Sequence, residues 1–155
     1  MQNFFKKIIE LLFPNQCLSC GQLIGQEGAF CNECWQKLQF ITDPKCKICS
    51  HPFEFQVEDA LICAQCCAKK PSYDKAVSIF AYNHLIKKIV GDFKYRDTTY
   101  LAKKFARILF NHSSDLINNA DLIVPVPLHK KRLRKRKFNQ ALLLAQELSK
   151  IWTLK

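Results

Sequence analysis

Four short cysteine motifs decide the fold of the first half of this chain: Cys17-Leu-Ser-Cys20, Cys31-Asn-Glu-Cys34, Cys46-Lys-Ile-Cys49 and Cys63-Ala-Gln-Cys66. Ten residues separate the first two motifs and thirteen separate the last two, so one unit of four cysteines occurs twice. Two residues between paired cysteines let a tight turn bring both thiolates to one side of a metal ion. Four equal spacings are typical of metal binding rather than of free core cysteines.

The eight paired cysteines are predicted to hold two structural Zn²⁺ ions. Zn²⁺ prefers a tetrahedral shell with sulfur at about 2.3 Å, and four thiolates leave no open position for a substrate water. An iron–sulfur cluster, which also takes four thiolates, is the main alternative. The predicted ligands are Cys17, Cys20, Cys31, Cys34, Cys46, Cys49, Cys63 and Cys66.

The pairing of these ligands has alternatives. Sequential pairing, with one zinc ion for each unit, is the simplest assignment, and a cross-braced pairing of alternate motifs stays open. A ninth cysteine, Cys67, is an alternative metal ligand to Cys66, but the matching spacings favour Cys66. A segment of about 50 residues buries too little surface to fold alone, so the metal is expected to supply the missing stability.

The cellular compartment is also predicted from the sequence. Met1–Phe13 contains Glu10 and lacks a small-residue cleavage site, so it does not resemble a signal peptide. The chain has no apolar run near the roughly 18 residues of a transmembrane segment. We therefore predict a cytoplasmic protein, in which nine cysteines bind metal more readily than they form disulfides.

Charge divides the chain where the cysteines end. Residues 1–70 carry seven basic and seven acidic residues, whereas residues 71–155 carry 17 basic residues, six acidic residues and no cysteine. The second part therefore holds the whole net charge of +11. This asymmetry predicts two domains: a zinc module over 1–70, which begins with a short helix at 3–13, and a basic domain over 71–155. The apolar face of that helix is expected to cover the zinc module or the neighbouring domain, with a membrane surface as the alternative.

Apolar patterning in the second domain predicts alternating strands and helices. Lys75–Tyr82 alternates as a strand, and Asp121–Leu128 reads as a buried strand stopped by two prolines. Helical spacing predicts helices at Leu85–Phe93, Leu101–Phe110 and Phe138–Trp152. This order of elements is typical of an α/β sheet.

A dense basic run follows the second predicted strand. Seven of the eight residues from Lys130 to Lys137 are basic. Ligands of open α/β sheets bind where strands end, and arginine forks match phosphate oxygens. The loop 130–137 is therefore a candidate site for a polyphosphate or a nucleic-acid backbone, with a solvated charged loop as the alternative.

The cysteine pairs, followed by Phe93-Lys-Tyr95, Asp121-Leu-Ile-Val-Pro-Val-Pro-Leu-His129 and Arg132-Leu-Arg-Lys-Arg-Lys-Phe-Asn-Gln-Ala141, resemble the ComF family of competence-associated proteins. The resemblance runs from about Phe13 to the last residue. It implies an N-terminal double zinc ribbon, followed by an incomplete α/β domain of the type I phosphoribosyltransferase kind. It also implies a role in DNA uptake.

The same resemblance implies a phosphate site. The turn before the basic loop would lie at the pyrophosphate end of phosphoribosyl pyrophosphate (PRPP), and arginines of the loop would close over the phosphates. The implied residues are Val126, Pro127, Leu128, His129, Arg132, Arg134 and Arg136. The family usually has glycine before Phe-Asn-Gln, whereas this chain has Lys137, which lacks the access of glycine to left-handed conformations.

One family motif has no counterpart in this sequence. Family members carry an acidic turn, D-D-x-x-T-T-G, that faces the ribose and its Mg²⁺ and cradles the 5′-phosphate. Mg²⁺ with PRPP is therefore expected only in a complete family member, and this chain alone is expected to be catalytically incomplete. It is expected either to self-associate or to combine with a missing C-terminal fragment.

Two other functions stay open. The chain is alternatively a nucleic-acid-binding module that uses the basic loop 130–137, or a non-functional gene remnant. Candidate partners are single-stranded DNA and other competence proteins. A nucleic-acid backbone bound by the loop would be released as salt rises.

Overall fold

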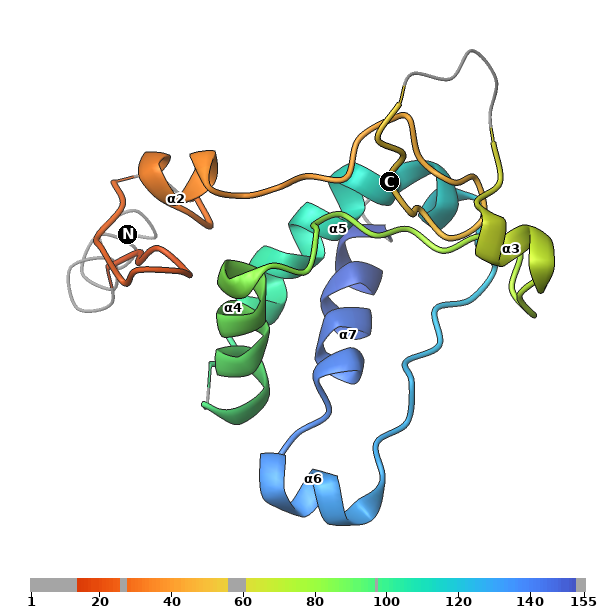
Figure 1. Cartoon of the computed structure of the whole chain (residues 1–155). Helices are drawn as coiled ribbons and strands as arrows, with labels where there is room; N and C mark the ends of the chain where they lie inside the picture. The colour runs from red at the N-terminus through yellow and green to blue at the C-terminus, as the bar shows by residue number, and fades with distance from the viewer. Residues whose placement is uncertain (1–13, 26–27, 56–60, 97, 153–155) are drawn as a thin grey trace.

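The computed structural model describes residues 14–25, 28–55, 61–96 and 98–152, so the predicted helix at 3–13 lies outside the described residues. The helices are α2 (Asn32–Gln36), α3 (Ala64–Ala68), α4 (His84–Tyr95), α5 (Leu101–Asn118), α6 (Lys130–Arg136) and α7 (Gln140–Trp152). Figure 1 shows an irregular module beside α2, another beside α3, and a helical part in which α6 projects at one end. Among the described helices, none has the length and apolar character needed to cross a membrane.

The two cysteine units fold alike, each as a tight hairpin followed by a short helix. In the first unit, the Cys17 N–H donates to the Gln22 carbonyl at 2.8 Å, and in the second the Cys46 N–H donates to the His51 carbonyl at 2.8 Å. One antiparallel bridge closes each hairpin, between Gln16 and Leu23 and between Lys45 and Pro52. The repeat in the sequence is therefore a repeat in the structure.

The first unit shares a core with α4. Ile86 and Ile89 of α4 are 8% and 1% exposed and pack in one cluster with Cys17 and Phe30. The side chain of Asn83 caps the helix, because its Oδ1 accepts the Ile86 N–H at 3.0 Å. The zinc module and the helical part are thus one packed body on this side of the molecule.

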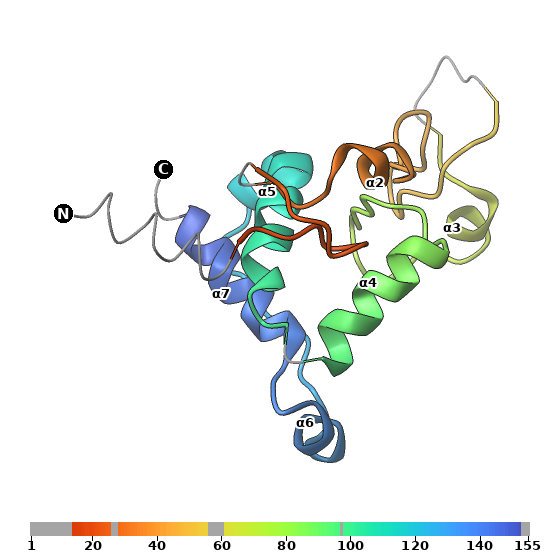
Figure 2. The ribbon, with the colours of Figure 1, turned by 90° about the vertical axis from the view of Figure 1, so that its left-hand side faces the viewer.

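The helical part has its own small core. Phe93, Leu101 and Ala102 are buried there, and Phe138 and Leu143 pack against them. Helices α5 and α7 lie side by side, with α4 close to one end of the pair (Figure 2). These three helices agree with the helical segments predicted from apolar spacing, although α5 extends eight residues beyond the predicted end at Phe110.

Neither predicted strand joins a sheet within the described residues. Lys75–Tyr82 makes one antiparallel bridge, between Phe80 and Phe40, and so pairs with the zinc module. Asp121–Leu128, predicted as a buried strand, is outside the helices and its alternate side chains are exposed. Exposed fractions of 72–75% occur at Leu122, Val124 and Val126. A strand buries side chains only against neighbouring elements, and none of the described residues supplies a second strand here.

Candidate metal centres and the basic helix

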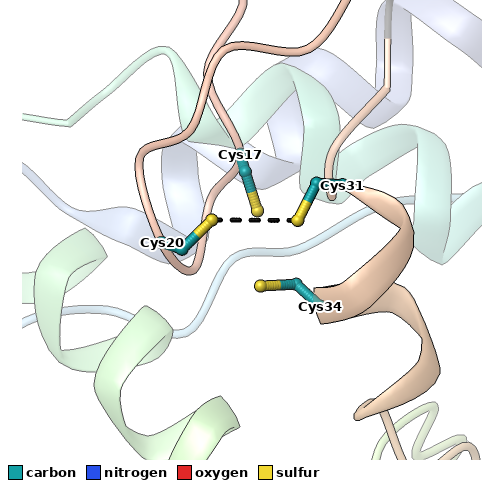
Figure 3. A group of neighbouring side chains, drawn as sticks. All are labelled: Cys17, Cys20, Cys31 and Cys34. Carbon is teal, nitrogen blue, oxygen red and sulfur yellow. Dashed lines mark hydrogen bonds between the residues drawn. The ribbon is translucent and has the colours of Figure 1, made fainter.

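The four sulfurs of each cysteine unit converge on one point. The Sγ atoms lie within 4.8 Å of one another in each of two groups: Cys17, Cys20, Cys31 and Cys34, and Cys46, Cys49, Cys63 and Cys66. In the first group, Cys17 and Cys20 come from the hairpin, and Cys31 and Cys34 come from the start of α2 (Figure 3). The groups are sequential, one for each unit, rather than cross-braced.

The sulfur spacing fits a single tetrahedral ion. The Sγ atoms of Cys20 and Cys31 are 3.8 Å apart, and those of Cys49 and Cys63 are 3.6 Å apart. Zinc–sulfur bonds of about 2.3 Å place tetrahedral sulfurs about 3.8 Å from one another. A disulfide would need about 2.05 Å, and all nine cysteines are free thiols. The two four-cysteine sites are therefore consistent with two structural zinc ions.

Backbone N–H groups favour one thiolate in each site. Burial raises the pKa of Cys17, but hydrogen bonds from the N–H groups of Cys20, Cys31 and Ser19 outweigh it and lower the pKa to about 6. In the second unit, burial is again outweighed by the three equivalent N–H groups, and the pKa of Cys46 is lowered to about 6. The backbone of each unit thus favours the thiolate form of one sulfur, which is the form that a metal binds.

Two other predicted ligands have a raised pKa instead. Burial raises the pKa of Cys34 to about 12, and burial also raises the pKa of Cys66. Because a metal binds thiolates, it must displace the protons from these sulfurs, and proton release couples metal affinity to pH.

Cys67 stands outside the second group of sulfurs. Its side chain is exposed, and its Sγ lies 3.7 Å from the Ile62 carbonyl. Its N–H donates to the Cys63 carbonyl at 3.0 Å, just as the Trp35 N–H donates to the Cys31 carbonyl at 2.8 Å. Cys67 therefore occupies the position of Trp35 in the repeat, one residue beyond the ligand position.

The basic run, expected as a loop, forms the short helix α6. His129 caps its start, because its Nδ1 accepts the Lys131 N–H at 3.3 Å. Lys137 ends it with a φ of 66°, in the left-handed region, and its N–H donates to the Leu133 carbonyl at 2.7 Å. Lysine thus adopts the conformation that glycine favours, at the position where the ComF pattern usually has glycine.

The arginines of α6 face different surroundings. Arg132 and Arg134 are exposed to solvent. The guanidinium of Arg136 instead lies 5.0 Å from the centre of the Tyr95 ring, and donates to the Tyr95 hydroxyl at 3.1 Å and to Gln140 Oε1 at 3.3 Å. The hydrogen bond and charge of Arg136 lower the pKa of Tyr95. Arg136 therefore joins α6 to α4 and α7.

The turn Val126–His129 leads directly into α6. The Asn139 side chain donates to the Val126 carbonyl at 3.1 Å and accepts the Ala141 N–H at 3.0 Å. It thereby ties the turn to the start of α7. The contacts of Tyr95 and Gln140 with Arg136 were not predicted, since no motif spacing marks them.

Known proteins resemble this chain both in its zinc module and along most of its length. The double zinc ribbon domain family matches residues 8–68. The chain is 28% identical to "Competence protein F" of Haemophilus influenzae over 144 residues, which cover 89% of this chain and 61% of that protein. It is 27% identical to "Competence protein ComFC" of Bacillus subtilis, over 80% of this chain and 53% of that protein.

A third relative carries a name from DNA metabolism. The "DNA utilization protein YhgH" of Salmonella typhimurium is 27% identical over 86% of this chain and 53% of its own length. No solved structure matches the chain significantly. The chain thus spans between 53% and 61% of the length of these curated relatives.

The two sequential four-cysteine units define a protein with an N-terminal double zinc ribbon. Within that class, the chain is similar to Competence protein F and to Competence protein ComFC, in agreement with the resemblance that its motifs indicated.

Proposed function

We propose that this protein handles DNA during its uptake or use, with the zinc ribbons as a scaffold and α6 as the element that contacts phosphate. Its relatives are named for competence and for DNA utilization. The observation that carries the proposal is the exposure of α6, which projects at one end of the molecule (Figure 1; Figure 2). Its exposed basic side chains, with that of the residue that follows, are Lys130, Lys131, Arg132, Arg134, Lys135 and Lys137.

Like charges on α6 favour a polyanionic ligand. Lys130 and Arg134, and likewise Lys131 and Lys135, are four residues apart on one helix. Each such pair of like charges destabilises a helix by about 0.2–0.5 kcal/mol. A nucleic-acid backbone would offset this repulsion, and its condensed counterions would be released on binding.

The contact is expected to involve backbone phosphates rather than bases. Phe138, the aromatic residue beside the basic run, is half-buried, and its ring centre lies 6.4 Å from that of Phe93. A ring held in this core does not offer its face to a base. Binding should therefore have little sequence preference and should weaken as salt rises.

Both metal sites are proposed to hold Zn²⁺ in a structural role. A cluster of several irons and sulfides needs more room than four sulfurs within 4.8 Å leave, whereas one tetrahedral ion fits. When bound, the ion supplies folding energy and fixes each hairpin against its helix. The eight cysteines predicted from the spacing are the proposed ligands.

A second candidate function is polyphosphate binding by a phosphoribosyltransferase-like domain over 71–155. The turn Val126–His129 precedes α6 directly, and the hydrogen bond from Asn139 to Val126 fixes the turn to α7. In this candidate, Arg132 and Arg134 approach the pyrophosphate of PRPP, which brings Mg²⁺. The rest of the site would come from the part of the relatives that this chain does not span.

Fluorescence anisotropy with labelled single-stranded oligo-dT tests the proposal. The logarithm of the affinity should fall with the logarithm of salt, with a slope of about −0.7 for each phosphate contacted. The double variant Arg132→Ala/Arg134→Ala should weaken binding at least tenfold, while the charge-matched control Lys69→Ala/Lys70→Ala should change it little. Equal weakening in both variants, or an affinity that ignores salt, would rule out α6 as the contact.

The two candidates predict different responses to PRPP. If the protein only handles DNA, PRPP with Mg²⁺ should displace the oligonucleotide no better than an equal concentration of pyrophosphate. Under the second candidate, PRPP should compete more strongly than pyrophosphate, and Val126→Asp should remove that difference.

A further inference from the structure

A cavity of about 640 Å³ lies between the second zinc unit and the far end of α5. Three segments that are distant in the sequence form its walls: residues 43–50, residues 75–77 and residues 111–116. Figure 1 shows the end of α5, in cyan, beside this second unit, in orange and yellow. None of the residues that line the cavity belongs to α6, so the cavity is distinct from the surface in the proposed function.

Lysines from two of these walls face the cavity. Lys45 and Lys47 come from the hairpin, and Lys75 comes from the extended segment. The Lys45 Nζ lies 3.8 Å from the carboxylate of Asp43, so part of its charge is offset. Among the described residues, Lys47 and Lys75 make no ion pair and remain available to an anionic group.

The α5 wall is unusually polar because the helix is distorted there. Side chains of a regular helix are about 100° apart, so six consecutive residues cannot all face one cavity. α5 leaves helical geometry at Ser113, with φ of −135° and ψ of 21°, where two serines adjoin. The consecutive polar residues at this break that line the cavity are Asn111, His112, Ser113, Ser114 and Asp115.

The cavity is lined by both cationic and anionic side chains, and this combination indicates the class of ligand. Lysine ammonium and serine hydroxyl groups are good donors to phosphate oxygens. Asp43 and Asp115 would repel a bare inorganic anion, but carboxylates accept hydrogen bonds from sugar hydroxyls. A ligand with an anionic end and several hydroxyl groups satisfies both sets of residues.

We propose that this cavity binds a phosphorylated ribose, such as that of a nucleotide, with Lys47 and Lys75 at the phosphate and Asp115 at the ribose. The volume supports a ligand of this size, since pockets for small molecules range over about 300–1,000 Å³. The ligand would bridge the second zinc unit and α5, so binding is coupled to how these two parts pack.

Calorimetric titration of the zinc-loaded full chain with ADP tests the proposal. Lys75→Glu should reduce the ADP affinity at least tenfold, and adenosine should bind at least tenfold more weakly than ADP. Lys69→Glu is a matched control, because Lys69 is exposed and does not line the cavity. Arg134→Glu on α6 should leave the ADP affinity unchanged, which separates this site from the proposed DNA contact.

A second variant protects the test against misfolding. Lys47→Gln removes a charge beside Cys46, so the zinc content of each variant is measured together with its ADP affinity. Weaker ADP binding with two zinc ions retained supports the site. Three results would overturn it: no ADP binding at millimolar concentration, equal affinity for adenosine and ADP, or a larger loss in Arg134→Glu than in Lys75→Glu.

Discussion

Gly21 and Ser50 occupy equivalent positions in the two zinc units, and both have left-handed backbones, with φ of 76° and 61°. Each residue directly follows the second cysteine of its hairpin. Each N–H donates to the carbonyl of the first cysteine, Cys17 or Cys46, at 3.0 Å. Glycine adopts this conformation without steric cost, whereas serine does not. The repeat therefore keeps the backbone geometry of the hairpin but changes the residue that provides it.

Gly21→Ala should destabilise the first unit by about 1–2 kcal/mol, the cost of a left-handed conformation for a residue with a Cβ. Apart from Gly21 and its two chain neighbours, no heavy atom lies within 4 Å of the position that this Cβ would take, so the cost comes from the backbone alone. Denaturant unfolding of the zinc-loaded protein measures it. A matched Gly25→Ala variant, at a glycine that also has open space around it, should change stability less.

Ser50→Ala should destabilise the second unit more than Ser50→Gly does. Ser50 is buried, and its hydroxyl donates to the Ala76 carbonyl at 2.8 Å. Alanine loses this hydrogen bond, worth about 0.5–1.5 kcal/mol, and keeps the left-handed strain. Glycine loses the same bond but relieves the strain. Thermal unfolding of both variants gives the order, and a less stable glycine variant would contradict this account of Ser50.

Cys31→Ser should reduce the zinc content from two ions to one, because a hydroxyl is a poor zinc ligand. The first unit should then unfold, since structural zinc contributes about 10 kcal/mol or more of folding energy. Loss of this unit should also expose Ile89, which is 1% exposed and shares its core. Zinc analysis and circular dichroism provide the readout, and Cys67→Ser is the matched control that should keep both ions.

Zinc retention should fall as the pH is lowered through about 6. The pKa values of Cys17 and Cys46 are lowered to about 6, so each thiolate contributes stability that is present above its ordinary pKa near 9. That contribution declines as pH falls and is lost below the folded-state pKa. In addition, protons compete with Zn²⁺ for these two sulfurs below the pKa of about 6, so a zinc-sensitive dye should report release that grows steeper as the pH falls from about 7 to about 5. Release that is constant over this range would contradict proton coupling.

The two groups of four cysteines were predictable because their determinants are local. A Cys-x-x-Cys turn fixes two sulfurs within four residues, and the duplicated spacing indicated which turns meet. The same repeat identified Cys66 rather than Cys67, and the structure groups Cys66 with the other sulfurs. Helices α4, α5 and α7 were also predictable, since their apolar spacing is contained within each segment.

The conformations of the predicted strands and of the basic segment depend on contacts with residues that are distant in the sequence. Asp121–Leu128 has the composition of a buried strand, but burial requires neighbours that the described residues do not supply. Arg136 belongs to a basic run in the sequence, yet it reaches Tyr95, 41 residues away, and only the tertiary structure brings them together. The break in α5 at Ser113, which forms one wall of the cavity, likewise had no signal in the apolar pattern.

Lys137→Gly should stabilise the end of α6 by about 1 kcal/mol, because glycine removes the left-handed cost that lysine carries at φ of 66°. The hydrogen bond from its N–H to the Leu133 carbonyl needs no side chain and is retained. Lys137→Ala is the control for the lost charge, since it removes the ammonium group but keeps the strain. Amide hydrogen exchange in α6 should slow in the glycine variant relative to the alanine variant. Equal exchange in the two variants would mean that the backbone conformation at Lys137 does not limit the stability of α6.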